Sequence, residues 1–135
     1  MSNFGPVIPL LVYEDLPAAH DFLVKAFGFK AGGVMRTPEG QAVHGEVQVG
    51  ETSIWLHRVT GEHELASPTV ANMKGGGLVV YVDDVDAHCS HARAAGAHIL
   101  SEPVDQPYGQ REYGARDVEG HLWWFATRAN AEAKS

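Results

Sequence analysis

Two stretches of the chain share one order of apolar and polar positions. The first runs from Val7 to Phe29, and the second runs from Gly77 to Ala97. Each begins with a run of β-branched and other apolar residues, which is typical of a strand. Each continues with apolar residues at helical spacing, which predicts a helix with one buried stripe. The recurrence of this order after about 69 positions indicates an internal duplication.

Short polar signals mark the ends of the two predicted helices. Asp15 and Asp84 stand where the carboxylate of an N-cap accepts hydrogen bonds from free backbone N–H groups. Pro17 follows in the first turn, where its missing N–H costs little. Gly28 and Gly96 come after the last apolar positions, and glycine readily takes the left-handed conformation that ends many helices.

Each predicted helix is followed by three further apolar runs that predict strands. These cover residues 29–35, 43–49 and 52–59 in the first half, and 97–100, 111–116 and 121–127 in the second. The order βαβββ therefore occurs twice, which predicts an α+β fold. We expect a single domain, residues 1–135, that divides into a first module (6–59), a linker or flap (60–76), a second module (77–128) and a tail (129–135).

Composition and charge narrow the choice of partners. The 135 residues are 44% hydrophobic, which is enough for a folded core, and the formal net charge is −7. The ten basic residues are scattered, which argues against nucleic acid and against anionic membranes as partners. No apolar run approaches the roughly 20 residues that span a bilayer, and the first residues lack the basic region of a signal peptide. We expect a cytoplasmic protein whose acidic surface attracts cationic small molecules.

Few residues have the chemistry of a common catalytic motif. Cys89 is the single cysteine, so an internal disulfide and a cysteine-cluster zinc site are excluded, and its place on the apolar side of the second helix predicts a buried, inert thiol. His88 and His91 are expected on the solvent side of that helix. Neither a phosphate-binding glycine motif nor a nucleophile elbow occurs in the sequence.

The segment from Tyr108 to Phe125 resembles a hairpin of the vicinal oxygen chelate superfamily, also called the glyoxalase/bleomycin resistance protein/dioxygenase family. The family's Arg-Asp-Pro-x-Gly pattern falls on residues 116–120, with Val118 where proline is usual. The resemblance extends over about residues 6–128. It implies that the curled mixed sheets of the two modules surround a cup-shaped pocket. It also implies a homodimer, because half-cups from two chains commonly complete the pocket in this family.

Metal-dependent members of the family place one ligand on the first strand and one on the last strand of each module. By the resemblance, and by counting four residues from each turn glycine, these positions fall on Ile8, Ile54, Gly77 and Trp124. None of these side chains can bind a metal, and a shift of one residue in either direction still builds no site. Since a transition metal needs about three or four N, O or S ligands, we expect no metal and no cofactor.

Strand alternation predicts which side chains face the cup. The residues expected to contact a ligand are His44, Glu46, Gln48, Ile54, Leu56, Tyr81, Arg111 and Trp124. Trp124 is equally compatible with stacking on a ligand and with core packing. Trp55 and Trp123 are expected to pack against the helices.

Among the polar residues, His44 and Glu46 form the pair that best fits catalytic or metal-binding chemistry. At positions i and i+2 of a strand they project to one side, about 7 Å apart. They are candidates for a general base with an orienting carboxylate, or for two metal ligands, and they are equally well explained as a solvated strand edge.

Three functions remain open. We favour a metal-independent protein without turnover that sequesters an antibiotic, or a similar aromatic or cationic ligand, in a dimer cleft, as in the bleomycin-resistance branch of the family. The alternative is a glyoxalase-like lyase or isomerase, or a dioxygenase, with a relocated metal or with His44 and Glu46 as an acid–base pair. A regulatory module that binds a metabolite is the third.

Overall fold

The computed structural model of this protein describes residues 5–60 and 76–128. Apart from its two end residues, the predicted linker or flap lies outside the described residues, and so does the predicted tail. No helix in the described ranges combines the length and the apolar character needed to cross a membrane.

The order βαβββ occurs twice, as predicted. The first module contains β1 (Leu10–Tyr13), α1 (Leu16–Phe27), β2 (Lys30–Arg36), β3 (Ala42–Val49) and β4 (Thr52–Arg58). The second contains β5 (Gly77–Tyr81), α3 (Val85–Ala94), β6 (His98–Gln106), β7 (Gln110–Arg116) and β8 (Leu122–Arg128). Asp15 and Asp84 cap the two helices by accepting from backbone N–H groups three residues on, at 3.1 Å in both cases.

One strand is much longer than the sequence indicated. The predicted strand over residues 97–100 is the start of β6, which continues to Gln106 and passes through Pro103. A proline is compatible with this strand because β6 lies at the edge of its sheet and its pairing with β7 is irregular between Ser101 and Val104.

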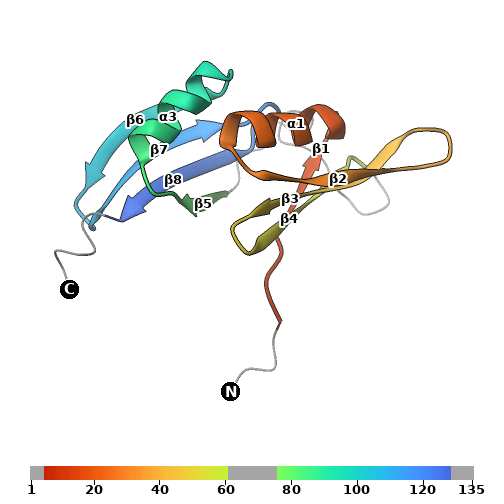
Figure 1. Ribbon diagram of the computed structural model, residues 1–135, viewed down its shortest axis with the longest axis horizontal. Helices are drawn as coiled ribbons and strands as arrows, with labels where there is room; N and C mark the ends of the chain where they lie inside the picture. Colours follow the sequence, from red (N-terminus) through yellow and green to blue (C-terminus); the bar gives the residue numbers. More distant parts are fainter. Residues whose placement is uncertain (1–4, 61–75, 129–135) are drawn as a thin grey trace.

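Each module forms its own four-stranded sheet, in the orders β1-β4-β3-β2 and β5-β8-β7-β6. The first strand of each module pairs in parallel with the last, and the remaining pairs are antiparallel. Both helices lie on the same side of the two sheets, next to each other (Figure 1). The sheets do not close into a cup within one chain, and β1 and β5 are edge strands.

Strand pairing defines which residues of the two modules are equivalent. Trp55 pairs with Leu10 of β1, and Trp124 pairs with Val79 of β5, so the two tryptophans occupy matching positions. Counting from the turn glycines matched Ile54 to Trp124 instead, and this prediction is wrong by one residue. The β3–β4 and β7–β8 turns differ in length, and therefore the distance from a turn glycine is not the same in the two modules.

The hydrophobic core lies between the helices and the sheets and belongs to both modules. The ring of Phe27 from α1 lies 5.4 Å from that of Trp123 and 4.8 Å from that of Phe125, both on β8. Trp123 is fully buried, as predicted. Burial of a side chain of this size contributes about 2–3 kcal/mol, so these rings hold the two modules together.

Two residues expected in the cup lie in this core instead. Ile54 and Leu56 are 3% and 0% exposed and pack in this core, on the opposite face to the one that strand alternation predicted, although Ile54 also lines a recess with Val79 and Tyr81. Trp55, which was expected to pack against the helices, is 40% exposed on the opposite face. A one-residue change of register exchanges the two faces of a strand, which accounts for all three errors.

The turn between β7 and β8 binds the first module through two buried carboxylates. Asp117 accepts hydrogen bonds from the hydroxyl of Tyr13 and, at 3.0 Å, from Nε1 of Trp123. Glu119 accepts from the backbone N–H groups of Glu14 and Asp15, both at 2.7 Å. Burial first, and then the charge of Asp117, raises the pKa of Tyr13 well above its ordinary value, so Tyr13 stays a donor. We call Asp117 and Glu119 the turn anchor.

The turn keeps its shape without the usual proline. Oδ1 of Asp117 accepts from the backbone N–H groups of Glu119 and His121, at 3.0 and 3.1 Å. The side chain of Val118 is more than half exposed, so the shape of the turn does not depend on its packing.

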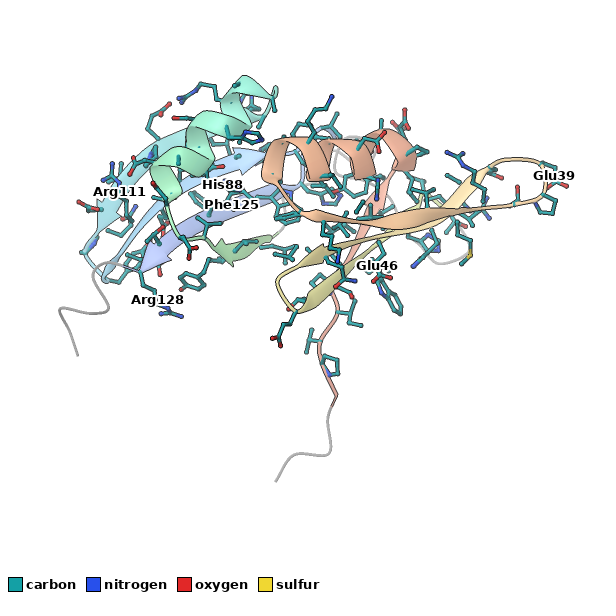
Figure 2. All side chains as sticks on the ribbon, viewed as in Figure 1. Glu39, Glu46, His88, Arg111, Phe125 and Arg128 are labelled. Carbon is teal, nitrogen blue, oxygen red and sulfur yellow. The ribbon has the colours of Figure 1, made fainter. Side chains whose placement is uncertain are left out.

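His88 lies between the modules rather than on the solvent side of α3, which corrects the sequence prediction. Its Nδ1 is 2.7 Å from the hydroxyl of Tyr113, and its Nε2 is 2.8 Å from the carbonyl oxygen of Phe27 on the first module. Figure 2 shows His88 and Phe125 together beneath α3. His91 adds a second contact between the helices, from Nε2 to the carbonyl oxygen of Lys25 at 2.8 Å.

Removal of the turn anchor should destabilise the whole fold. Asp117→Ala leaves the Tyr13 hydroxyl and the Trp123 indole N–H buried without their acceptor, which costs about 3 kcal/mol of unfolding free energy. Urea denaturation measures this loss, with Asp83→Asn at an exposed aspartate as the control. A loss below about 0.5 kcal/mol would show that the turn anchor is dispensable.

The unfolding free energy should fall as the pH falls below about 6.5. Burial lowers the pKa of His88 below its ordinary value of 6.5, so the unfolded chain takes up a proton at a higher pH than the folded chain does. Urea unfolding at about pH 5.5 and about pH 7.5 measures the slope. His88→Gln should reduce it, whereas His98→Gln, at an exposed histidine, should leave it unchanged. Equal slopes in both variants would contradict this assignment.

Candidate functional site

Each sheet has one face covered by a helix and one face that no helix or strand of residues 5–60 and 76–128 covers, which we call its open face. Strand alternation and register assign the side chains to these faces. The first open face carries His44, Glu46, Gln48, Ser53, Trp55 and His57. The second open face carries Val79, Tyr81, Gln110, Glu112, Trp124 and Arg128. Figure 2 shows Glu46 and Arg128 on the side of the sheets away from the helices.

A hydrogen-bonded polar cluster holds Glu46 in place on the first open face. The side-chain amide of Gln48 donates to Glu46 and, at 2.8 Å, to Oγ of Ser53. The hydroxyl of Ser53 donates to Oε2 of Glu46 at 3.0 Å. Both donors reach the same carboxylate oxygen, so Glu46 has a fixed orientation and retains acceptor capacity for a ligand.

His44 contacts a different neighbour. Its ring meets the indole of Trp55 edge to face, with 5.4 Å between the centroids. The described contacts thus orient Glu46 through Gln48 and Ser53, whereas His44 is placed by Trp55. The two residues share a face, as the sequence indicated, but the hydrogen bonds do not join them as an acid–base pair.

A shallow recess of about 280 Å³ adjoins these residues at the edge of the first sheet. Residues 32–35 of β2 and residues 44–46 of β3 line it. A Cβ atom at Gly32 would lie 2.6 Å from the carbonyl oxygen of Glu46, so only glycine allows this approach. In the sequence, the Gly32-Gly33 pair inside a predicted strand is the feature that indicates this recess, since a glycine in a strand often marks a place where another backbone comes close.

Trp124 forms an aromatic surface on the second open face. A Cβ atom at Gly114 would lie 2.5 Å from Cζ3 of the indole, which means that the ring lies directly over the β7 backbone at Gly114. The side chain remains partly exposed. The sequence allowed either ligand stacking or core packing for Trp124, and the indole lies on the face opposite to the buried Trp123 and Phe125.

Tyr81 and Arg128 occupy the same face. The guanidinium of Arg128 lies 4.2 Å from the ring centroid of Tyr81, an attractive cation–π contact. The hydroxyl of Tyr81 donates to Gln110 at 2.9 Å, and the amide of Gln110 donates to Glu112 at 2.9 Å. This face therefore combines aromatic rings with one guanidinium and one carboxylate that have defined positions.

Arg111 does not belong to either open face, contrary to the sequence prediction. Its guanidinium binds Asp86 of α3 through two hydrogen bonds of 2.9 and 3.0 Å, and Asp105 at 3.2 Å. It pairs with Thr127 on the helix-covered side of the sheet. The hydrogen bond from Arg111 lowers the pKa of Asp86, so the ion pair persists over a wide pH range.

The structure brings together part of the predicted site. His44, Glu46 and Gln48 lie on the first open face, and Tyr81 and Trp124 lie on the second. Ile54, Leu56 and Arg111 lie elsewhere. Trp55, which the sequence did not place among the ligand contacts, also lies on the first open face, and its equivalence to Trp124 is visible only once the strand pairing is known.

The positions that would hold a metal do not offer metal ligands. On the last strands the register gives Trp55 and Trp124, and the first-strand positions expected from the sequence are Ile8, which precedes β1, and Gly77. Within residues 5–60 and 76–128, no three side chains of His, Cys, Asp or Glu gather closely enough to hold a metal ion. The residues present therefore do not fit a metal centre at this place.

Comparisons with known proteins give one family model and several similar proteins. The model of the Glyoxalase/Bleomycin resistance protein/Dioxygenase superfamily matches residues 6–125. The crystal structure of TioX from Micromonospora sp. ML1 is 35% identical, with a TM-score of 0.70, and the match covers 93% of this chain and 99% of that one. The uncharacterized protein Mb0911c of Mycobacterium bovis is 30% identical over 90% of this chain and 82% of its own length. A glyoxalase/bleomycin resistance protein/dioxygenase from Nocardioides shares the fold at 20% identity and a TM-score of 0.69, over 97% of this chain and 87% of that one.

Gly114 should control the position of Trp124. In Gly114→Ala the added methyl group cannot coexist with the indole where it lies, so the ring must move and its exposure must change. Near-ultraviolet circular dichroism and tryptophan fluorescence measure the change. The control is Gly76→Ala, because a Cβ atom there meets nothing within 4 Å. Identical spectra for Gly114→Ala and the unmodified protein would contradict the described packing.

Proposed function

Since the chain belongs to the Glyoxalase/Bleomycin resistance protein/Dioxygenase superfamily, we propose that it is a metal-independent binding protein for a small aromatic or cationic molecule. The ligand, such as an antibiotic, is sequestered without turnover. The binding cleft lies between two copies of the chain, where the open faces of the two copies meet.

The observation that carries the proposal is the aromatic and apolar surface on the open faces. Trp55, Val79 and Tyr81 are 40%, 55% and 48% exposed there, next to Leu10 at 42%. Exposed apolar surface of this kind, with polar residues around it, is typical of interaction and ligand sites. It supports both a second copy as partner and an aromatic ligand.

Edge strands and charge support the second copy. The outer edges of β1 and β5 have no strand beside them among the described residues, and unpaired edges are the usual places for strand addition. Glu46 on the first open face and Arg128 on the second carry opposite charges. The second open face also carries Glu112, so a two-fold dimer that opposes the two faces is favoured in the register that places Glu46 nearer Arg128 than Glu112.

Glu46 supports a cationic ligand. Its carboxylate is already oriented by Gln48 and Ser53, so it binds a cation with little loss of side-chain freedom. Binding without turnover is favoured over a lyase or dioxygenase because the metal positions lack ligands and His44 is not joined to Glu46.

Binding should be saturable, stoichiometric and dependent on Glu46. We expect titration calorimetry with the planar cation proflavine to give one site per chain, and Glu46→Gln to weaken binding about tenfold, since a charge-assisted contact is lost. Glu51→Gln, in the exposed β3–β4 turn, is the control and should bind like the unmodified protein.

Native mass spectrometry tests the remainder of the proposal. We expect a dimer that takes up no zinc, nickel or manganese and returns proflavine unchanged. Stoichiometric uptake of any of these metals, or conversion of a bound ligand to product, would overturn the proposed metal-independent binding.

A further inference from the structure

The junction between the two modules has two equivalent ends, and different side chains stand at them. By the register that makes the two tryptophans equivalent, Val12 of β1 corresponds to Tyr81 of β5. By the same register Thr52, the first residue of β4, corresponds to His121, just before β8. One end of the junction therefore combines Val12 with His121, and the other end combines Tyr81 with Thr52.

His121 closes its end of the junction with a ring and a hydrogen bond. Its Nε2 lies 2.8 Å from the carbonyl oxygen of Val12, and a carbonyl oxygen only accepts, so this ring nitrogen carries the proton and donates it. The ring also meets that of Tyr13 edge to face, with 4.6 Å between the centroids. An imidazole thus fills the space and supplies the donor that the outward carbonyl of an edge strand needs.

At the other end, the carbonyl oxygen of Tyr81 has the same outward direction. The N–H of Val82 donates to the carbonyl oxygen of Ala126 on β8 at 2.8 Å. In a parallel ladder, residues alternate between facing the partner strand and facing the outer edge, so the backbone N–H and carbonyl of Tyr81 face the edge. Within residues 5–60 and 76–128, Tyr81 makes its side-chain contacts through its hydroxyl and its ring, and no side chain donates to this carbonyl.

A recess of about 280 Å³ lies where an imidazole would stand at this end. Thr52 and Ile54 of β4 line it together with residues 78–81 of β5, and Figure 1 shows the β3–β4 turn beside β5. Ile54 belongs to the hydrophobic core, and Leu78 packs against it. The walls are therefore apolar, and the polar groups are the Thr52 hydroxyl and the backbone edge of β5.

The β3–β4 turn does not close the recess as its counterpart does. Val49 pairs with Thr52, whereas the backbone of Asp117 pairs with His121, so the two pairs are equivalent. An apolar side chain thus stands where the second module has a carboxylate of the turn anchor. The junction is held firmly at one end and hollow at the other.

From this equivalence we infer that the recess binds a small, neutral, planar heterocycle with a ring N–H, of the azole class. The ring lies between Ile54 and Leu78, its N–H donates to the carbonyl oxygen of Tyr81, and a second ring nitrogen accepts from the hydroxyl of Thr52. The apolar walls disfavour a charged ligand. The volume is several times the roughly 30 Å³ of a water molecule, which leaves room for a fused two-ring azole. The site lies within one chain and does not depend on the proposed cleft between two copies.

Benzimidazole in its neutral form is the probe. In a ¹H–¹⁵N NMR titration it should bind with a Kd below about 1 mM and shift the backbone amide signals of Thr52 and Tyr81. 1-Methylbenzimidazole has the same shape but lacks the N–H, so it should bind at least tenfold more weakly. Benzimidazole that shifts neither amide signal, or equal affinity of the two compounds, would overturn the inference.

Exchange of the two equivalent residues tests the argument from duplication. Thr52→His places an imidazole in the recess, so the affinity for benzimidazole should fall at least tenfold. His121→Thr hollows the other end, so a second benzimidazole site per chain should appear, with a shift of the Val12 amide signal. Glu39→His, at the distant tip of the β2–β3 hairpin, is the control and should bind like the unmodified protein (Figure 2).

The remaining outcomes are equally decisive. A folded Thr52→His variant with unchanged affinity overturns the inference, and so does a folded His121→Thr variant with a single site. If the NMR spectrum of Thr52→His shows an unfolded chain, Thr52→Leu fills the recess with apolar atoms in its place.

Competition separates this site from the open faces. Saturating proflavine should leave benzimidazole bound, and displacement would place benzimidazole on the open faces and overturn the inference. A protein that binds benzimidazole in the recess but does not bind proflavine contradicts the proposed function alone.

Discussion

The contact between the β7–β8 turn and the first module determines the arrangement of everything else. Asp117 and Glu119 are buried carboxylates that accept hydrogen bonds from donors of the first module. Asp117 accepts from the Tyr13 hydroxyl, and Glu119 accepts from the backbone N–H groups of Glu14 and Asp15, just before α1. Burial of unpaired groups of this kind costs several kcal/mol, so the two modules have one favourable relative orientation. In that orientation the helices share one side, and both open faces turn away from them (Figure 1).

The duplication gives the two sheets similar open faces, and single residues make these faces different. At matching places of β3 and β7 the chain has Glu46 and Gly114, so one sheet presents a carboxylate beside its tryptophan and the other presents a bare indole. Glycine is required at this place of β7, because a Cβ atom at Gly114 would lie 2.5 Å from the indole of Trp124.

Patterns among neighbouring residues predicted the fold, whereas prediction of the site required knowledge of which strands pair and in which register. The aspartate caps, the helical stripes and the order βαβββ depend on neighbouring residues and were read correctly from the sequence. The faces of β4 depend on register, which the turn length sets, and so Ile54, Leu56 and Trp55 were assigned to the wrong sides. Arg111 and His88 were misplaced because their partners, on α3 and in the first module, are distant in sequence.

The segment that best identifies the family does not describe the ligand. Asp117 binds Tyr13, Trp123 and its own turn, so its contacts join the two modules of this chain. The residues that would touch a ligand lie on β3, β4 and β8, where alternation leaves every second side chain free to differ. For this reason a family match establishes the fold, and function has to be argued from the open faces themselves.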